Sequence, residues 1–289
     1  MTSSPRGNLL SPVLRWVLLV VYLVFTLSPI VWLFLSTVQT QASLLRVPPH
    51  LLPQDITFAN YVNIFKPAAF GENSGQSTFF LALRNSVLVA LGTTAIAMTL
   101  GTLGAYAIAR FNIPGRRWLL LLVLGTQLLP AISIIIPLFR MFKLTSLLDT
   151  LFALILAYST FSIPFVVWIM AGYFQSVPAE LEEAARIDGA SRFQSFIRIA
   201  LPLAAPGLAA TAIFTLLNSW DEFFFALVFT STYAAKTVPV AIAEFIGRHS
   251  VDWGMLVTGG FIASLPPLII SLVFYRYIVS GLAAGGIKG

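Results

Sequence analysis

The sequence predicts an all-α protein that crosses a membrane several times. Of its 289 residues, 58% are hydrophobic and only 10% are charged, and the mean hydropathy is +0.89. Soluble domains have about 45–50% apolar residues, and so few charges could not cover a soluble fold of this size. The apolar residues also gather in runs of about 18 or more, the length that a helix needs to cross a bilayer.

Six apolar runs predict six membrane-spanning helices in one transmembrane domain. The first follows Arg6 and Arg15, as the core of a signal peptide would. Its apolar length and the absence of a convincing small-residue cleavage site favour a retained helix. The predicted spans cover residues 16–35, 79–108, 118–139, 151–173, 206–229 and 255–278.

Lysine and arginine indicate the orientation of these spans. Both residue types collect in cytoplasmic loops, and the segment "ARFNIPGRR" between the second and third spans is a dense basic cluster. With this loop inside, ten of the 17 Lys and Arg residues lie on the cytoplasmic side. We therefore expect a multi-pass protein of the cytoplasmic membrane with both termini in the cytoplasm. The net charge of +6 then reflects topology and contact with lipid rather than nucleic-acid binding.

The loop between the first two predicted spans is long, and several spans contain prolines or regularly spaced small residues. Residues 39–78 form a long external loop that either folds as a cap, contacts an external partner or merely connects two helices. Prolines interrupt spans three, four and six and allow bends. The second span has a small residue at every fourth position, which lets another helix approach closely. These residues are Thr93, Ala97, Gly101, Ala105 and Ala109.

The residue types needed for most enzyme active sites are scarce. The chain has no cysteine, which excludes disulfides and thiolate metal sites. Its two histidines, His50 and His249, are far apart in predicted loops. No loop assembles a nucleophile, a base and a metal site. We therefore predict no catalytic residue and no metal ligand, and a membrane enzyme is a disfavoured alternative.

One segment is charged in this otherwise apolar chain. "ELEEAARIDGASRFQSFIRIALPLAAPG", residues 180–207, holds seven of the chain's 28 charged residues. Pro178 can begin a helix, and Gly189 can end it in a left-handed conformation. Ser191 can cap a second helix over residues 192–200. The two helices would form a rigid cytoplasmic surface within a loop at residues 178–205. The alternative, an amphipathic helix on lipid headgroups, is disfavoured by three glutamates, Glu180, Glu182 and Glu183, near its start.

This segment closely resembles the cytoplasmic "EAA" loop of permease subunits in binding-protein-dependent ABC importers. The resemblance rests on seven fixed positions, Glu183, Ala184, Ala185, Gly189, Ile199, Leu201 and Pro202. The segments "NSVLVALGTT", "AYAIARFNIPGRR", "LLDT", "WDEFFFALVFT" and "YIVSGLAAGGIKG" resemble the carbohydrate-uptake branch, and in particular the second permease subunit of maltose-type systems. One departure is Asp221, where that branch usually has Asn.

The resemblance implies a type I ABC importer permease fold and a coupling helix that docks into a separate ATPase. The residues implied in this coupling are Glu182, Glu183, Ala184, Ala185, Asp188, Gly189, Ile199, Leu201 and Pro202. The chain lacks a P-loop sequence, so ATP and Mg²⁺ would bind to the partner and no cofactor to this chain. The implied partners are two ATPase subunits, a homologous second permease and an extracytoplasmic binding protein that delivers a sugar or oligosaccharide. The implied mechanism is alternating access.

The fifth span carries a polar face that could line the transport pathway. At 100° per residue, five polar residues of this span fall within about 120° of one another, namely Thr211, Thr215, Asn218, Asp221 and Glu222. Carboxylates inside a membrane are functional candidates. A structural hydrogen-bond network is the alternative. The face has no basic residue, which argues against a phosphorylated substrate. The candidate pathway residues are Gln127, Tyr158, Thr215, Asn218, Trp220, Asp221 and Glu222.

Two other transport functions remain open from the sequence. A glycerol-phosphate or glycerophosphodiester importer uses the same permease family, and a cationic residue from the partner permease would favour it. A gradient-driven secondary transporter would need no ATPase, but such proteins usually contain inverted repeats and paired broken helices. We find no repeat in this sequence.

Overall fold

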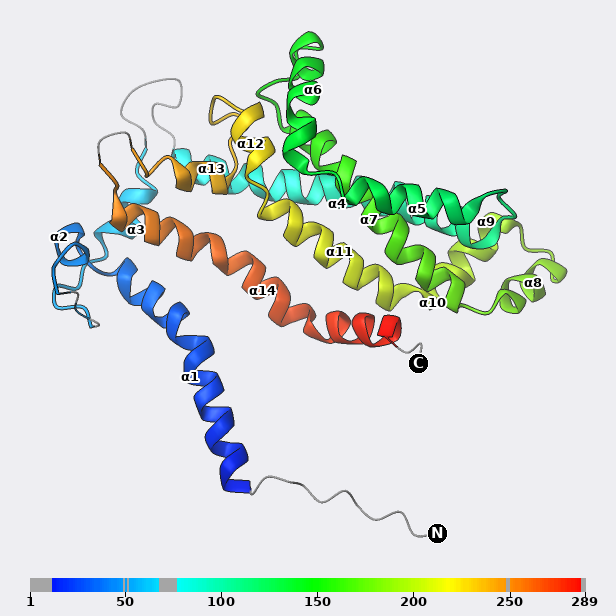
Figure 1. The fold of residues 1–289 in the computed structure, drawn as a ribbon, viewed down its shortest axis with the longest axis horizontal. Coiled ribbons are helices and arrows are strands. Elements are labelled where there is room, and N and C mark those ends of the chain that lie inside the picture. The colour runs from blue at the N-terminus through cyan, green and yellow to red at the C-terminus, as the bar shows by residue number, and fades with distance from the viewer. Residues whose placement is uncertain (1–11, 49, 51, 68–76, 248–249, 287–289) are drawn as a thin grey trace. The chain divides into compact units, whose positions relative to one another are not determined.

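The computed structural model describes residues 12–48, 50, 52–67, 77–247 and 250–286, with side chains to residue 277. These residues form helices and no strand, apart from two isolated bridges, Gln39–Ile56 and Ile246–Val251. The chain divides into two compact units, residues 1–64 with 245–262, and residues 65–244 with 263–289. Figure 1 shows the helices in chain order.

The first unit combines a long apolar helix with a small folded loop. None of the most apolar 18-residue window of α1 is buried within the protein, so its side chains present an apolar surface typical of a lipid-exposed helix. Beyond α1, Asn60 Nδ2 donates to the carbonyl oxygens of Thr37 and Gln39, at 2.8 and 2.9 Å. The described part of the predicted 39–78 loop is therefore folded, while residues 68–76 lie outside the description. The helices of this unit are α1 (Pro12–Thr37), α2 (Gln41–Leu44), α3 (Ala59–Ile64) and the start of α14 (Trp253–Gly286).

The second unit is built around α4 (Thr78–Arg110), which lies along α7 (Leu151–Ser176) (Figure 1). A Cβ at Gly101 would lie 2.7 Å from Val166 Cβ, so the two backbones approach closely there. Ala97 and Ala105, one turn to either side, are fully buried. The predicted small-residue packing face is thus confirmed. The remaining helices are α5 (Arg116–Gln127), α6 (Ala131–Leu144), α8 (Ala179–Ile187), α9 (Arg192–Ser195), α10 (Leu201–Leu203), α11 (Ala205–Trp220), α12 (Phe224–Phe229) and α13 (Val238–Ala243).

Two of the six predicted spans are broken helices. Among the described residues, four helices, α1, α4, α7 and α14, are long and apolar enough to cross a membrane. Two bent pairs, residues 116–127 with 131–144 and residues 192–203 with 205–220, raise the number to six. In the predicted span 118–139, α5 and α6 meet at 88°. Pro130 lies at this break, where it lacks an N–H and restricts Leu129. In the predicted span 206–229, α11 ends at Trp220 and α12 begins at Phe224.

The close α4–α7 contact gives a stability prediction. We expect Gly101→Ala to destabilise the protein by about 1–3 kcal/mol, because the new methyl group must displace Val166 in a packed interface. The matched control is Gly125→Ala in α5, where a Cβ meets nothing within 4 Å and alanine favours the helix. Thermal unfolding in detergent would measure both, and equal midpoints for the two variants would contradict the prediction.

Candidate functional site

The charged segment folds as the sequence predicts, with one local difference. Helix α8 is followed by Gly189, whose φ of +92° lies in the left-handed region. Ser191 caps α9, and Gln194 completes a capping box with it. The predicted helix 192–200 is α-helical only to Ser195 and then widens into a π-helical turn over Phe196–Ala200. Pro202 explains this change, because it cannot donate to Arg198 and its ring would clash with that carbonyl in an α-helix.

The two adjacent glutamates of α8 differ in burial. Glu182 is buried, and its Oε2 accepts from Tyr106 Oη at 2.6 Å while its Oε1 accepts from Arg110 Nε at 2.7 Å. Arg110 also donates to the carbonyl oxygen of Val177, at 2.8 Å. The Glu183 side chain is 62% exposed and lies 3.9 Å from Arg186. Glu182 therefore fastens α8 to the end of α4 and is not available on the surface, whereas Glu183 is.

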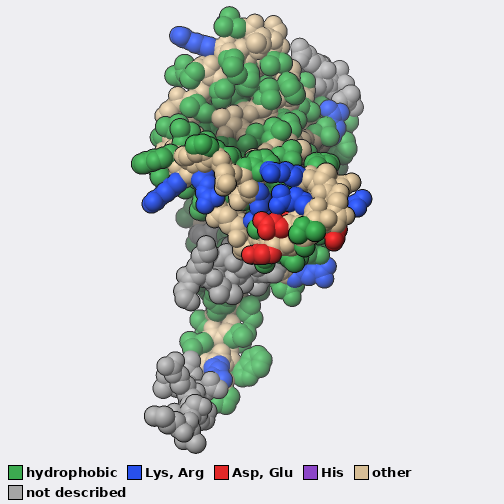
Figure 2. Space-filling model, turned by 90° about the vertical axis from the view of Figure 1, so that its right-hand side faces the viewer, with side chains coloured by type: hydrophobic (Ala, Val, Ile, Leu, Met, Phe, Trp, Pro, Cys, Tyr) green, Lys and Arg blue, Asp and Glu red, His purple; other side chains and the backbone are tan. Residues whose placement is uncertain are grey.

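The exposed side of this segment combines apolar and charged groups. Leu181 and Ile187 of α8 and Phe193 of α9 project large apolar side chains outward, and Ile187 is 86% exposed. Blue and red side chains also gather at this end of the molecule in Figure 2. Among the predicted coupling residues, those with exposed side chains or backbone are Glu183, Ala184, Asp188, Gly189 and Pro202, while Ala185, Ile199 and Leu201 are half-buried.

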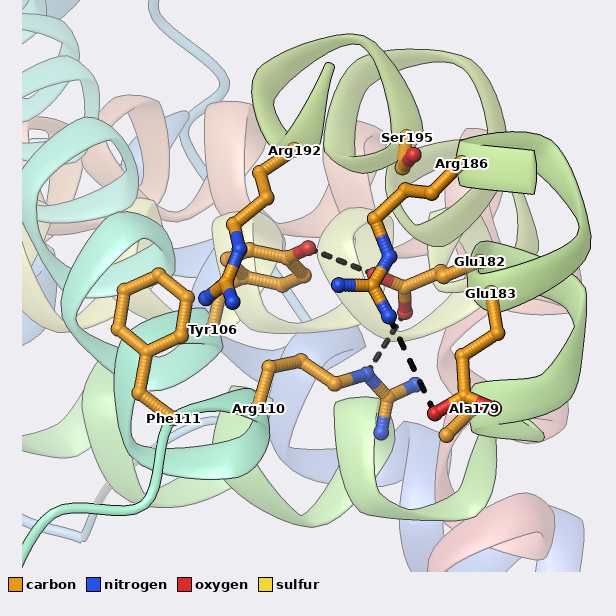
Figure 3. A pocket seen from close by; sticks show the side chains of 9 residues that line it. All are labelled: Tyr106, Arg110, Phe111, Ala179, Glu182, Glu183, Arg186, Arg192 and Ser195. Atoms are coloured by element: carbon orange, nitrogen blue, oxygen red, sulfur yellow. Dashed lines mark hydrogen bonds and ion pairs between the residues drawn. The ribbon is translucent and has the colours of Figure 1, made fainter. Parts of the chain in front are cut away.

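A pocket of about 200 Å³ lies between the end of α4 and the helices α8 and α9. Figure 3 shows arginine side chains from three elements directed into it. Arg192 extends over the ring of Phe111, with its guanidinium carbon 5.3 Å from the ring centre. The sequence predicted neither this pocket nor the contribution of Arg110, because the residues are brought together from distant parts of the chain. The lining residues that carry charge are Arg110, Glu182, Glu183, Arg186 and Arg192.

A second pocket, of about 240 Å³, lies where the break between α5 and α6 meets the end of α11. Five of the seven predicted pathway residues line it, namely Gln127, Tyr158, Thr215, Asn218 and Glu222. Phe161, Ser162, Phe165, Ser219 and Phe225 also line it and were not predicted. Irregular backbone at membrane depth is tolerated where it borders a cavity, and discontinuous helices form the binding sites of many transporters.

Two polar groups of the second pocket, the Glu222 carboxylate and the Tyr158 hydroxyl, lie next to each other. The Glu222 carboxylate accepts from the backbone N–H groups of Phe225 and Ala226, at 3.0 and 3.3 Å, and so caps α12. The Tyr158 hydroxyl is buried and faces the Glu222 carboxylate and the Thr237 hydroxyl. Buried hydroxyl groups normally have a partner, and Glu222 supplies one for Tyr158 at the wall of the pocket.

The two other predicted pathway residues lie elsewhere. Trp220 is buried, and its indole Nε1 donates to the carbonyl oxygen of Ala263 at 3.1 Å. Its ring is therefore packed against α14 and does not line the pocket. Asp221 is exposed at the end of α11 and is not among the residues that line the pocket. The polar face predicted on the fifth span thus divides at the end of α11, with Glu222 turned inward and Asp221 outward.

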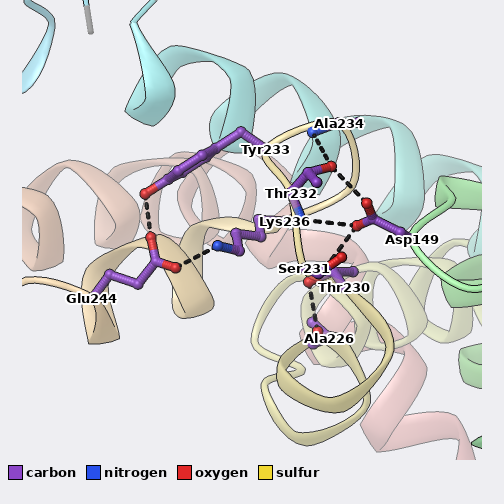
Figure 4. A network of polar contacts seen from close by, with 9 residues as sticks. All are labelled: Asp149, Ala226, Thr230, Ser231, Thr232, Tyr233, Ala234, Lys236 and Glu244. Carbon is purple, nitrogen blue, oxygen red and sulfur yellow. Dashed lines mark hydrogen bonds and ion pairs between the residues drawn. The ribbon is translucent and has the colours of Figure 1, made fainter. Parts of the chain in front are cut away.

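Asp149, in the "LLDT" segment, joins two loops at the other end of α7. Its Oδ1 accepts from the N–H groups of Ser231 and Thr232, and its Oδ2 accepts from Thr232 Oγ1 at 2.6 Å (Figure 4). Asn85 of α4 holds the same loop by donating to the carbonyl oxygens of Tyr233 and Lys236. The loop between α12 and α13 is therefore fixed from two sides.

The hydrogen bonds at Asp149 predict a pH-dependent contribution to stability. Partial burial opposes ionisation, but the bonds from Thr232 and Ser231 outweigh it and lower the Asp149 pKa below its ordinary 3.8. A lowered pKa stabilises the fold above the unfolded value, and this contribution is lost as pH falls through the folded value. We expect Asp149→Asn to flatten the dependence of the thermal midpoint on pH below about pH 5. The same slope in Asp149→Asn and in the native protein would contradict the assignment.

The described residues contain no group of three His, Cys, Asp or Glu side chains that could hold a metal ion.

Comparison with known proteins identifies the family. The model of the family "Binding-protein-dependent transport system inner membrane component" matches residues 97–283. The trehalose transport system permease protein SugB of Mycobacterium tuberculosis is 37% identical over 267 residues, which cover 92% of this chain and 93% of the relative. The trehalose/maltose transport system permease protein MalG of Thermococcus litoralis is 35% identical over 286 residues, covering 98% and 99%.

Solved structures show the same fold at lower identity. A chain in the crystal structure of a bacterial ABC transporter involved in the import of the acidic polysaccharide alginate has a TM-score of 0.73 and 23% identity. The match covers 96% of this chain and 99% of that one. The fold is thus that of type I ABC importer permeases, as expected from the sequence. Since the family model covers more than half of a chain that has six candidate spans, this is a multi-pass protein of the cytoplasmic membrane that belongs to the family of binding-protein-dependent transport system inner membrane components.

Proposed function

We propose that this chain is one permease subunit of an ATP-driven importer that moves a sugar or oligosaccharide into the cell by alternating access. The observation that carries the proposal is the α8–Gly189–α9 segment, a rigid charged surface fastened to α4 through Glu182 and Arg110. Its exposed apolar side chains suit contact with a soluble partner. The sugar is supported by the names of relatives, among them permeases for trehalose and for sulfoquinovosyl glycerol.

The proposed assembly contains a homologous second permease, two ATPase subunits and an extracytoplasmic binding protein. ATP and Mg²⁺ bind to the ATPase subunits. The α8 end faces the cytoplasm together with both termini, and the loop fixed by Asp149 and Asn85 faces outward. In this orientation the basic segment "ARFNIPGRR" is cytoplasmic. This agrees with the excess of Lys and Arg in the short cytoplasmic loops of membrane proteins.

We place the substrate route at the second pocket. Tyr158, Asn218 and Glu222 offer hydrogen-bonding groups, and Phe161 and Phe225 offer apolar ring faces. Sugars have both polar edges and apolar faces, so this combination suits them. No Lys, Arg or His of the described ranges lines the pocket, which disfavours the glycerol-phosphate alternative unless the second permease supplies a cation.

The bend at Gly189 provides the test of the assembly. We expect the native protein, extracted gently from its own membrane, to co-purify with a P-loop ATPase, and Gly189→Val to lose it. A β-branched residue resists the left-handed conformation at position 189. Gly115→Val is the matched control, because Gly115 has a φ of +73° in another loop.

If the native protein emerges alone in several detergents, or if it transports in vesicles with a gradient and no ATP, the ATP-driven importer is ruled out and a secondary transporter takes its place. Loss of the ATPase in both glycine variants would mean that the effect is general misfolding.

A further inference from the structure

The pocket between α4, α8 and α9 retains an unbalanced positive charge. Three arginines and two glutamates line it. Glu182 is already neutralised by Arg110 at 2.7 Å. Glu183 and Arg186 are 3.9 Å apart and largely exposed, a geometry in which an ion pair contributes little. Arg192 has no acidic partner in the described part of the chain and only rests over the Phe111 ring.

We propose that this pocket receives a carboxylate side chain of the ATPase partner, which binds between Arg186 and Arg192. The proposal rests on the proposed function, since it names a chemical contact of the same coupling surface. A guanidinium group presents a planar fork of donors that matches a carboxylate. Arg186 and Arg192 project into one pocket from different helices (Figure 3), so an incoming carboxylate can contact both.

Arg192 is prepared for this role by its surroundings. It is the first residue of α9, where the capping box of Ser191 and Gln194 fixes the backbone. Its guanidinium lies over the Phe111 ring, which restricts the side chain and leaves its edge free for hydrogen bonds. A side chain that is already ordered loses less conformational entropy when a partner binds.

The exposed residues of α8 favour a protein carboxylate over a lipid phosphate as the group that binds in the pocket. Glu180 and Glu183 are exposed on the first turns of α8 and would be repelled by an anionic membrane surface. Leu181 and Ile187 are exposed beside them. Large apolar side chains exposed next to charged residues are typical of a surface that binds a protein partner.

Carbodiimide cross-linking of the assembled transporter tests the contact. Arg192→Lys keeps the positive charge and supplies an amine that the reagent joins only to a carboxyl group in contact with it. The background is low, because residues 178–205 contain no lysine. Arg198→Lys is the matched control, since Arg198 is exposed on the next turns and does not line the pocket. Cross-linked peptides would be identified by mass spectrometry.

We expect position 192, and not position 198, to be joined to an Asp or Glu of the subunit that carries the P-loop. We also expect Arg192→Glu to leave at least about tenfold less ATPase bound after a salt wash, a loss that corresponds to about 1.4 kcal/mol. A link only to Glu183 of the same chain, or no link at position 192 while the ATPase co-purifies, overturns the inference and leaves the importer standing. If anionic lipid vesicles bind the native protein in place of the ATPase and Arg192→Glu abolishes this binding, the inference is also overturned. Absence of any ATPase from the native preparation overturns both this inference and the proposed ATP-driven importer.

Discussion

Replacing Arg110 with alanine is expected to destabilise the second unit by about 3–5 kcal/mol, the cost of leaving a buried carboxylate without its partner. Glu182 is 6% exposed, and Arg110 supplies both its 2.7 Å ion pair and the bond that holds Val177. The change should lower the midpoint of thermal unfolding in detergent and expose α8 to proteolysis. Arg198→Ala, at an exposed arginine in the same region, should have little effect.

A double substitution separates the ion pair from the packing of its side chains. Removing both charges with Arg110→Met and Glu182→Leu should recover most of the stability, because replacing a whole buried pair with apolar groups of similar volume is often neutral. The remaining deficit would measure the bonds to Val177 and Tyr106. If each single substitution cost less than about 0.5 kcal/mol, as surface changes do, Glu182 would not fasten α8 to α4.

The sequence predicted the bend of the charged segment at Gly189, but it did not predict which side chains of that segment are buried. Gly189 and Ser191 act on their own backbone neighbourhood, so their local chemistry was sufficient. Glu182 and Glu183 are chemically identical, and they differ only in the 100° that separates neighbours on a helix. Which of them is buried depends on Arg110, 72 residues away, and sequence spacing carries no information about that contact.

The same reasoning applies to the helices and to the second pocket. Apolar length identified the six candidate spans, because hydropathy measures what lipid tolerates. It could not show the 88° bend between α5 and α6, since composition is unchanged across the break. Phe161, Ser162 and Phe165 of α7 look like ordinary residues of a span, and only the approach of α11 and of the broken helices places them around a pocket.

Filling the second pocket is expected to reduce transport by at least about tenfold while the subunits still assemble. Ser162→Trp would place a bulky ring among Tyr158, Asn218 and Glu222 in a space of about 240 Å³. A substrate would then lose its hydrogen bonds to these groups, and even 1.4 kcal/mol of lost binding gives a tenfold effect. Uptake of the labelled sugar that the transporter's own binding protein binds, into proteoliposomes that contain the complete transporter, would measure the change.

The control for this change lies two residues earlier on the same helix. Thr160 of α7 is exposed and does not line the pocket, so Thr160→Trp adds the same ring on a different face and should leave uptake close to that of the native protein. Equal loss of uptake in both variants would show that a large residue is simply not tolerated in this part of α7. Normal uptake by Ser162→Trp in a correctly assembled transporter would show that the substrate crosses elsewhere, along a face supplied mainly by the second permease.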